Sequence, residues 1–218
     1  MPSDSPRSTA ETVATYIRSL IFHGHLKQGD RLRQDELAET LKVSRIPVRE
    51  AIIALDKEGW VTSEPHRGAF VNGFQRAEVE DQYTLLGTLY GLAAKRASSR
   101  ATPDDIDKLR ALQVELRATD DPDEIRFIND QILRALFKIA DSPRLSAVSR
   151  VMTGLVPGNF FALVPGAIAN QKRAMSRIVK AIGTGDSDVA SAEWTKLLRK
   201  QSQHVVALLE ERNLLKAS

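Results

Sequence analysis

The sequence predicts a mainly α-helical protein in two parts. A small amino-terminal domain of three helices and a β-hairpin precedes a carboxyl-terminal all-α antiparallel helical bundle. Three observations support this: apolar residues recur at helical spacing from Val13, an alternating apolar pattern flanks residues 66–68, and strand and glycine signals become scarce after Gln75. We therefore expect two domains, over residues 1–74 and 75–218.

The amino-terminal domain opens with two amphipathic helical patterns. Ser8 and Glu11 have the spacing of a capping box, and Gly24 is expected to end the first helix. A shorter second helix follows the turn LKQGD. The apolar positions of these two patterns are Val13, Tyr16, Ile17, Leu20 and Ile21, then Leu32, Leu37, Ala38 and Leu41.

A third helix and a hairpin complete this domain. Ser44 is a good N-cap, and Pro47 lies in the first turn, where a missing N–H costs little. After Gly59, the alternation in WVTSEP and GAFVNG predicts two strands with a basic tip between them. The buried stripe of the third helix is expected at Val48, Ala51, Ile52 and Leu55. This order of elements is typical of a winged helix-turn-helix domain.

Residues 75–218 carry a series of helical patterns separated by capping residues and prolines. The first contains Val79, Tyr83, Leu86, Tyr90 and Ala93. Later helices are expected to start at Thr102-Pro103, Asp121-Pro122 and Ser142-Pro143, to break or kink at Pro157-Gly158, and to continue over residues 168–182 and 186–209. We read the whole region as an antiparallel helical bundle.

Composition limits the class of protein. The chain has no cysteine, which excludes disulfides and thiolate metal sites and fits a reducing cytoplasm. No signal peptide or membrane span is apparent, so we expect a soluble, cytoplasmic protein without a membrane partner. The net charge is +3, yet residues 1–74 hold 10 basic and 10 acidic side chains. Affinity for a polyanion must therefore come from where basic groups lie.

Two arginines of the third helix have the spacing of a DNA-reading pair. Arg45 and Arg49 are four residues apart, so they share a face next to the buried stripe. A helix fits the major groove, where each arginine can bind guanine O6 and N7 and supply about 1–3 kcal/mol of discrimination. Ser44 and Arg33 are placed to contact phosphates. The alternative is a solvated helix with two surface arginines, which is what most such pairs are.

These motifs resemble the DNA-binding domain of the GntR family of bacterial transcriptional regulators. The matching segments are LIFHGHLKQGDRL, DELAETLKVSRIPVREAIIALDKEGWV and PHRGAFV. The segments LRALFKIADSPRL and RIVKAIGTGD resemble the FadR-type ligand-sensing domain, also called FCD. Asp35 falls where some family members carry a base-reading arginine, which puts that contact in doubt. The resemblance implies DNA contacts by Ser44, Arg45, Arg49, His66, Arg67 and Gly68.

The resemblance also implies where a metal would bind. Many FCD domains hold a divalent metal through one aspartate and three histidines, with an arginine and a glutamate nearby. Here the metal-ligand positions hold Asn129, Leu133, Met175 and Leu197, and the other two positions hold Leu86 and Tyr90. Leucine has no lone pair, and a thioether suits soft copper better than zinc or manganese. We therefore expect no metal and no cofactor.

The same six residues predict the character of an effector pocket. Burying an unpaired carboxylate among them would be costly, so we expect a substantially apolar ligand with Tyr90 and Asn129 as polar handles. One alternative is a filled, vestigial core in a domain that only dimerises. Another is a polar ligand held by groups elsewhere in the domain.

The resulting expectation is a homodimeric regulator, more often a repressor in this family, that binds a palindromic operator in double-stranded DNA. A small molecule in the helical bundle would shift its conformation and so the spacing of the two recognition helices, through the segment from Phe74 to Val79. We expect a bacterial, nucleoid-associated protein. The alternatives are a constitutive DNA-binding dimer and an enzyme tethered to DNA. The lack of paired catalytic groups argues against an enzyme.

Overall fold

The computed structural model describes residues 8–152, 156 and 160–216. The expected break at Pro157-Gly158 lies outside the described residues. The chain forms two compact units, one of Met1–Arg76 with Leu209–Ser218 and one of Ala77–Leu208. The described residues after Leu208, which were expected in the helical bundle, are grouped with the amino-terminal unit.

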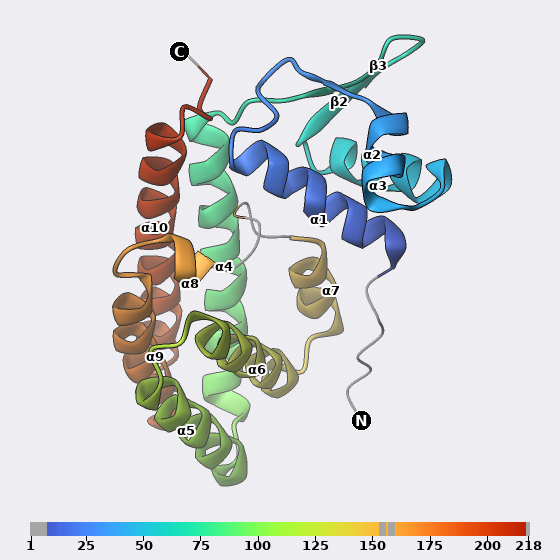
Figure 1. Cartoon of the computed structure of the whole chain (residues 1–218). Helices are drawn as coiled ribbons and strands as arrows, with labels where there is room; N and C mark the ends of the chain where they lie inside the picture. Colours follow the sequence, from blue (N-terminus) through green and yellow to red (C-terminus); the bar gives the residue numbers. More distant parts are fainter. Residues whose placement is uncertain (1–7, 153–155, 157–159, 217–218) are drawn as a thin grey trace. The chain divides into compact units, whose positions relative to one another are not determined.

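The first unit has the helix-turn-helix and wing that the sequence predicts, plus one short strand that it does not. Figure 1 shows α1, α2 and α3 gathered together, with the β2–β3 hairpin beside them. The elements are α1 (Thr9–Phe22), β1 (Arg31–Leu32), α2 (Gln34–Leu41), α3 (Arg45–Lys57), β2 (Val61–Glu64) and β3 (Gly68–Val71). The strands form an antiparallel sheet of order β1-β3-β2, in which Arg31 pairs with Phe70 and Val61 pairs with Val71.

The start of α1 corrects one expectation. The Ser8 hydroxyl accepts a hydrogen bond from the backbone N–H of Glu11 at 3.2 Å, as a capping box requires. The Glu11 carboxylate does not complete the box. It instead accepts from Arg18 Nη1 at 3.1 Å, because the buried guanidinium offers a stronger, charged donor than a backbone amide.

Apolar faces of α1 and α3 form the core of the first unit. Ile17 on α1 and Val48, Ala51 and Leu55 on α3 are completely buried, as the sequence pattern predicts. Arg18 is also buried and joins the two helices through the carboxylate of Glu58, which caps the end of α3. These contacts fix how the outer face of α3 is presented.

The last residues of the chain add a further connection to this unit. Phe74 forms a parallel β-bridge with Leu215, in which the Lys216 N–H donates to the Phe74 carbonyl at 2.8 Å. The Arg212 guanidinium lies 4.3 Å from the centre of the Phe22 ring, and its Nη1 donates to the Phe22 carbonyl at 3.2 Å. Arg212, Leu215 and Lys216 are therefore part of the packing around α1 and the end of the wing.

The second unit is all-helical. Its helices are α4 (Arg76–Arg100), α5 (Pro103–Ala118), α6 (Pro122–Ala140), α7 (Pro143–Val151), α8 (Phe160–Leu163), α9 (Ala167–Gly183) and α10 (Ser187–Glu211). The first residue of α4 and the last three of α10 belong to the first unit. The caps predicted at Thr102 and Asp121 are present, each accepting from backbone N–H groups of its helix.

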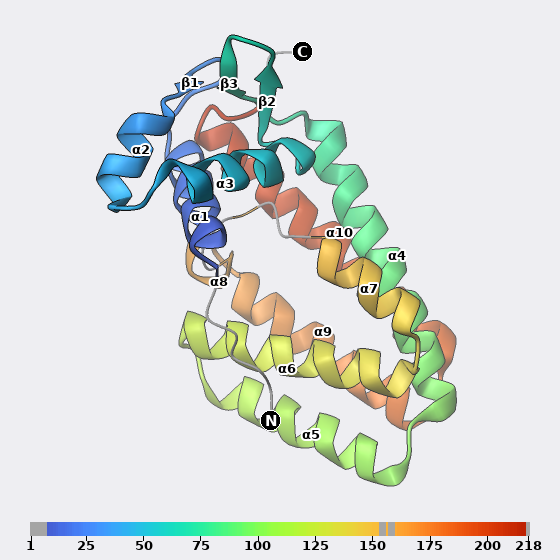
Figure 2. The ribbon, with the colours of Figure 1, turned by 90° about the vertical axis from the view of Figure 1, so that its right-hand side faces the viewer.

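Long helices α4 and α10 lie side by side and antiparallel in this unit (Figure 2). Glycines allow the close approach. A Cβ added at Gly87 would lie 3.3 Å from the Thr195 Cα, and one added at Gly91 would lie 2.7 Å from the Ser191 hydroxyl. Helices α5, α6 and α9 contact one another beside this pair. None of the described helices is both long enough and apolar enough to span a bilayer.

Candidate functional site

The amino-terminal turn of α3 presents two arginines away from the core. Arg45 and Arg49 are both exposed, while Val48 and Ile52 on the opposite side of the helix are buried. Ser44 precedes the helix in an extended conformation, and its side chain makes no capping hydrogen bond. Both arginines are thus exposed to solvent on the side of α3 that faces away from its buried stripe.

Two neighbours of these arginines alter the chemistry of that face. Ile46, the second residue of α3, is 63% exposed and adds an apolar side chain to this surface. Asp35, in the first turn of α2, forms an ion pair with Arg45 whose closest approach is 2.7 Å, from Oδ1 to Nε. The surface thus combines cationic, apolar and acidic groups within one turn of α3.

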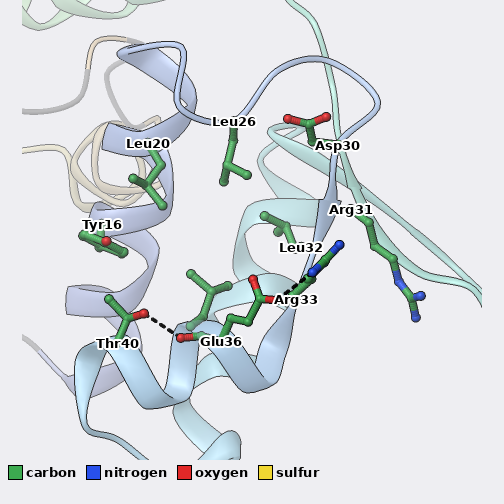
Figure 3. Close-up of a pocket in the computed structure, with 10 residues that line it drawn as sticks. Tyr16, Leu20, Leu26, Asp30, Arg31, Leu32, Arg33, Glu36 and Thr40 are labelled. Carbon is green, nitrogen blue, oxygen red and sulfur yellow. Dashed lines mark hydrogen bonds and ion pairs between the residues drawn. The ribbon is translucent and has the colours of Figure 1, made fainter.

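Arg33 lies at the start of α2, where it is exposed and pairs with Glu36 at 2.7 Å. The hydrogen bond to this carboxylate raises the pKa of Arg33 above its ordinary value, so the side chain stays a cation. Figure 3 shows this pair at the edge of a cavity of about 390 Å³, with Leu20 and Leu26 on its other side. The contact uses only Nη1, so the other N–H groups of the guanidinium can still donate to a phosphate.

The wing tip depends on unusual backbone conformations. His66 has a φ of 61° and Gly68 a φ of 104°, both in the left-handed region. A Cβ at Gly68 would also lie 2.9 Å from Arg31 Nε, so a larger residue would strain the turn and displace the Arg31 side chain. Arg67 is exposed, pairs with Glu64 and lies 5.7 Å from the centre of the Phe70 ring. The predicted basic tip is thus present, but its arginine already has a protein partner.

The residues predicted to bind a ligand all belong to the second unit, but only half of them are buried. Leu86, Met175 and Leu197 are buried, whereas Tyr90, Asn129 and Leu133 are partly exposed.

Tyr90 lies in a cluster of aromatic rings. Its ring centre lies 5.7 Å from that of Phe137 and 5.1 Å from that of Trp194, both in edge-to-face contact. Burial raises the pKa of Tyr90, an effect that a hydrogen bond with Ser149 opposes. The phenol is therefore neutral at physiological pH.

Three amide side chains of this unit form a hydrogen-bonded row, of which only Asn129 was predicted from the sequence. Gln171 donates from Nε2 to Asn129 Oδ1 at 2.5 Å and accepts at Oε1 from Gln201 Nε2 at 3.1 Å. Gln171 is 1% exposed. Its sequence signal was its position four residues before Met175, within the otherwise apolar stripe of α9. Asn129 is therefore held by Gln171.

Three polar atoms of α10 have no protein partner. Among the described residues, Trp194 Nε1, Ser202 Oγ and His204 Nδ1 are buried without a hydrogen bond. Trp194 and Gln201 are seven residues apart on α10, so they share its inward face. Unpaired donors in a core usually indicate a missing hydrogen-bonding partner.

The residues at the expected metal positions do not fit a hard metal ion. Asn129 shares its amide oxygen with Gln171, and Leu133 and Leu197 have no donor atoms. Throughout the described chain there is no group of three or more His, Asp or Glu that could hold a metal. We derive no metal chemistry at this site.

Comparisons with known proteins agree with this arrangement. The family model described as bacterial regulatory proteins, gntR family, matches residues 9–71, and the model of the FCD domain matches residues 81–200. The two matches fall within the helix-turn-helix unit and the helical unit respectively.

Several curated relatives are transcriptional regulators. An HTH-type transcriptional regulator of Mycobacterium tuberculosis is 32% identical over 161 residues, which cover 74% of this chain and 66% of that protein. The Nta operon transcriptional regulator of Aminobacter aminovorans is 37% identical over 91 residues, 42% of this chain and 43% of that protein. The repressor RspR of Escherichia coli is 30% identical over 131 residues, 57% and 56% of the two chains. The matches thus span no more than two thirds of these relatives.

Solved structures share the fold at low sequence identity. Lar, described as controlling the expression of the Listeria monocytogenes agr system, has a TM-score of 0.63 at 17% identity, covering 91% of this chain and 97% of that one. McbR/YncC of E. coli has a TM-score of 0.61 at 20% identity, with 94% and 98% covered. The FCD match alone extends over more than half of the 218 residues. The chain is therefore a member of the GntR family of bacterial regulatory proteins, with an FCD domain as its carboxyl-terminal part.

Proposed function

We propose that this protein is a homodimeric, DNA-binding transcriptional repressor controlled by a small molecule that binds in its helical unit. The observation that carries the proposal is the exposed Arg45–Arg49 pair on the first turns of a helix whose other face is buried. That arrangement lets the start of α3 enter a major groove and offer both guanidinium groups to guanines.

The remaining basic groups support binding by phosphate contact. Arg33 and Ser44 lie at the starts of α2 and α3, where they can contact the DNA backbone on either side of the groove. His66, Arg67 and Gly68 form a wing tip that can reach the neighbouring minor groove or backbone. Such contacts fix register, whereas the two α3 arginines supply the sequence preference.

A dimer follows from the symmetry of operators. Two copies related by a two-fold axis would place two α3 helices in successive major grooves and read an inverted repeat. The relative RspR is named a repressor, which favours repression over activation. Cytoplasmic, nucleoid-associated localisation is part of the same proposal.

The buried side chains of the helical unit suit an effector that is uncharged and largely apolar. Leu86, Met175 and Leu197 provide apolar surface, and in the described part of that unit the fully buried polar side chains are the uncharged Gln171 and Ser202. A carboxylate or an ammonium group would lose its hydration there without gaining a counter-ion. The amide row and the unpaired Trp194 N–H can instead bind a carbonyl, amide or hydroxyl group of the ligand.

Two continuous helices can carry a signal between the units. Helix α4 begins with Arg76 of the first unit, and α10 ends with residues of that unit beyond Leu208. Trp194, Leu197 and Gln201 lie on α10, so a ligand that moves this helix also acts on the segment that pairs with Phe74. The effector would shift the population of conformations that suit operator spacing.

Two alternative functions differ from this proposal in what they require of the helical unit. A constitutive DNA-binding dimer would have the same α3 surface but a core in which the amide row only packs. An enzyme tethered to DNA would need a group of catalytic side chains in the helical unit. Because the relatives are named transcriptional regulators, they favour a DNA-binding regulator over an enzyme.

Selection from a random DNA pool, followed by sedimentation of the complex, tests the DNA-binding proposal. We expect an inverted repeat bound by two chains per duplex. Selection of a single, asymmetric site by one chain would contradict the dimeric arrangement. No enrichment of any sequence would contradict specific DNA binding.

Thermal unfolding against matched neutral and ionised metabolites tests the effector proposal. We expect a neutral, partly apolar compound to raise the melting temperature and to weaken operator binding, because it binds the folded unit only. Stabilisation by carboxylates alone, or by no compound in a broad panel, would contradict the neutral-effector proposal. Gln171→Leu should abolish the stabilisation, and Gln113→Leu, whose amide bonds Ser176 instead, is the matched control.

A further inference from the structure

The Asp35–Arg45 ion pair lies on the candidate DNA-binding face, where an acidic residue is unexpected. Both side chains are largely exposed, 69% for Asp35 and 75% for Arg45. Exposed pairs of this kind contribute little to stability. An acidic group also repels the phosphates that dominate affinity for DNA. Neither folding nor general DNA affinity therefore accounts for a carboxylate here.

The geometry of the pair suits a role in base recognition. The carboxylate approaches the Nε side of the guanidinium at 2.7 Å, which leaves the terminal amino groups of Arg45 to bind O6 and N7 of a guanine. A carboxylate has about four acceptor positions, so one contact with arginine leaves Asp35 able to accept another hydrogen bond. The pair also restricts the Arg45 rotamer before DNA is bound, which lowers the entropy cost of binding.

The major groove offers few donors to such a carboxylate. Only cytosine, through N4, and adenine, through N6, present an exocyclic amino group there, whereas guanine and thymine present acceptors at the equivalent edge. A carboxylate beside a guanine-binding arginine is therefore attracted to one kind of base edge and repelled by the other.

We propose that Asp35 and Arg45 read DNA as one unit: Arg45 binds a guanine, and Asp35 accepts a hydrogen bond from the amino group of a cytosine or adenine in the same half-site. This inference rests on the proposed insertion of α3 into the major groove. Asp35 is then a specificity-determining residue. It lowers the affinity for DNA in general and increases the discrimination between bases at one base-pair position.

Binding titrations with wild type and Asp35→Ala on a selected operator, with every base pair of one half-site varied in turn, test the inference. We expect Asp35→Ala to lose roughly tenfold or more of the discrimination at one position, and to bind all duplexes somewhat more tightly. Asp35→Asn should shift that position towards adenine, because an amide can both donate to N7 and accept from N6.

Glu39→Gln is the matched control, because Glu39 is another exposed acidic residue of the same helix. It should raise affinity for all duplexes alike and leave every base preference unchanged. If Asp35→Ala gives this same uniform profile, Asp35 only weakens Arg45 or repels phosphate, and the inference is wrong.

Arg49→Ala in the same titrations separates this inference from the proposed function. If Arg49→Ala removes base discrimination while Asp35→Ala matches Glu39→Gln, α3 reads DNA and only the role of Asp35 fails. If Arg45→Ala and Arg49→Ala both leave discrimination intact, α3 is not the reading helix and the proposed function fails with it.

Discussion

Replacing Glu58 by glutamine should destabilise the amino-terminal unit far more than the same change at Glu11, although both carboxylates bind Arg18. Arg18 has only 9% of its side chain exposed. It makes three hydrogen bonds to Glu58, two from Nη2 at 2.8 and 2.9 Å and one from Nε at 3.1 Å. Its contact with Glu11 is a single bond at 3.1 Å.

The expected magnitudes follow from burial. The Glu58 side chain is 24% exposed, so Glu58→Gln leaves a buried cation half-paired and should cost about 2–3 kcal/mol, somewhat below the cost for a fully buried pair. The Glu11 side chain is 47% exposed, and Glu11→Gln should cost less than about 1 kcal/mol. The ratio between the two tests whether burial, rather than the mere presence of an ion pair, decides the energy.

Tryptophan fluorescence can report on the first unit alone. Trp60 lies in that unit and Trp194 in the other, so a Trp194→Phe background leaves Trp60 as the reporter. Urea unfolding of both variants in this background gives the two free-energy differences with any effect of the background cancelled. Equal losses, or a loss below about 0.5 kcal/mol for Glu58→Gln, would refute the reasoning.

Three further predictions concern other parts of the molecule. If exposed Ile46 contacts a thymine methyl group, replacing one operator thymine by uracil should weaken wild type but not Ile46→Ala; equal sensitivity in titrations would exclude the contact. Burial raises the pKa of Asp130, so the folded protein binds the proton of this carboxyl group more tightly than the unfolded chain does. Asp130→Asn should therefore stabilise the protein at pH 7, and the gain in stability should shrink as the pH falls towards about 4. A pH-independent difference in urea unfolding would contradict this. Truncation after Glu211 removes the contacts of Arg212 and the bridge to Phe74. It should lower the free energy of unfolding by at least about 1 kcal/mol, or the melting temperature followed by Trp60 fluorescence by roughly 4–8 °C. An unchanged melting temperature would show that these contacts contribute nothing to stability.

The sequence predicted the elements that depend on local patterns. The buried stripe Val48, Ala51, Ile52 and Leu55 identified α3, because a helix buried on one side repeats every three to four residues. The cap residues Thr102 and Asp121 marked the starts of α5 and α6 for a similarly local reason.

Features that depend on distant parts of the chain escaped prediction. Strand β1 has only two residues, Arg31 and Leu32, and exists because β3 pairs with it. The bridge from Phe74 to Leu215 joins segments that are far apart in the sequence. No periodicity indicates either of them, because both depend on tertiary contact.

At the candidate ligand site too, the hydrogen bonds between polar groups could not be predicted because they depend on tertiary contact. The predicted residues included Asn129, but the glutamines that complete its amide row lie on α9 and α10. The only sequence signal for Gln171 was its position within the apolar stripe of α9, and Gln201 had none. At the candidate DNA-binding face, the sequence marked Asp35 as a departure from the family pattern, whereas its ion pair with Arg45 became apparent only from the structure.

Operator discrimination by Arg49→Ala tests the central claim most directly. The measurement is the ratio of affinities for a selected operator and for an unrelated duplex, at several salt concentrations, with Lys57→Ala at the far end of α3 as control. We predict that Arg49→Ala loses most of this ratio, roughly tenfold or more per half-site, while keeping salt-sensitive binding to both duplexes. Lys57→Ala should keep the ratio. An unchanged ratio for Arg49→Ala would contradict the claim that the start of α3 reads the bases.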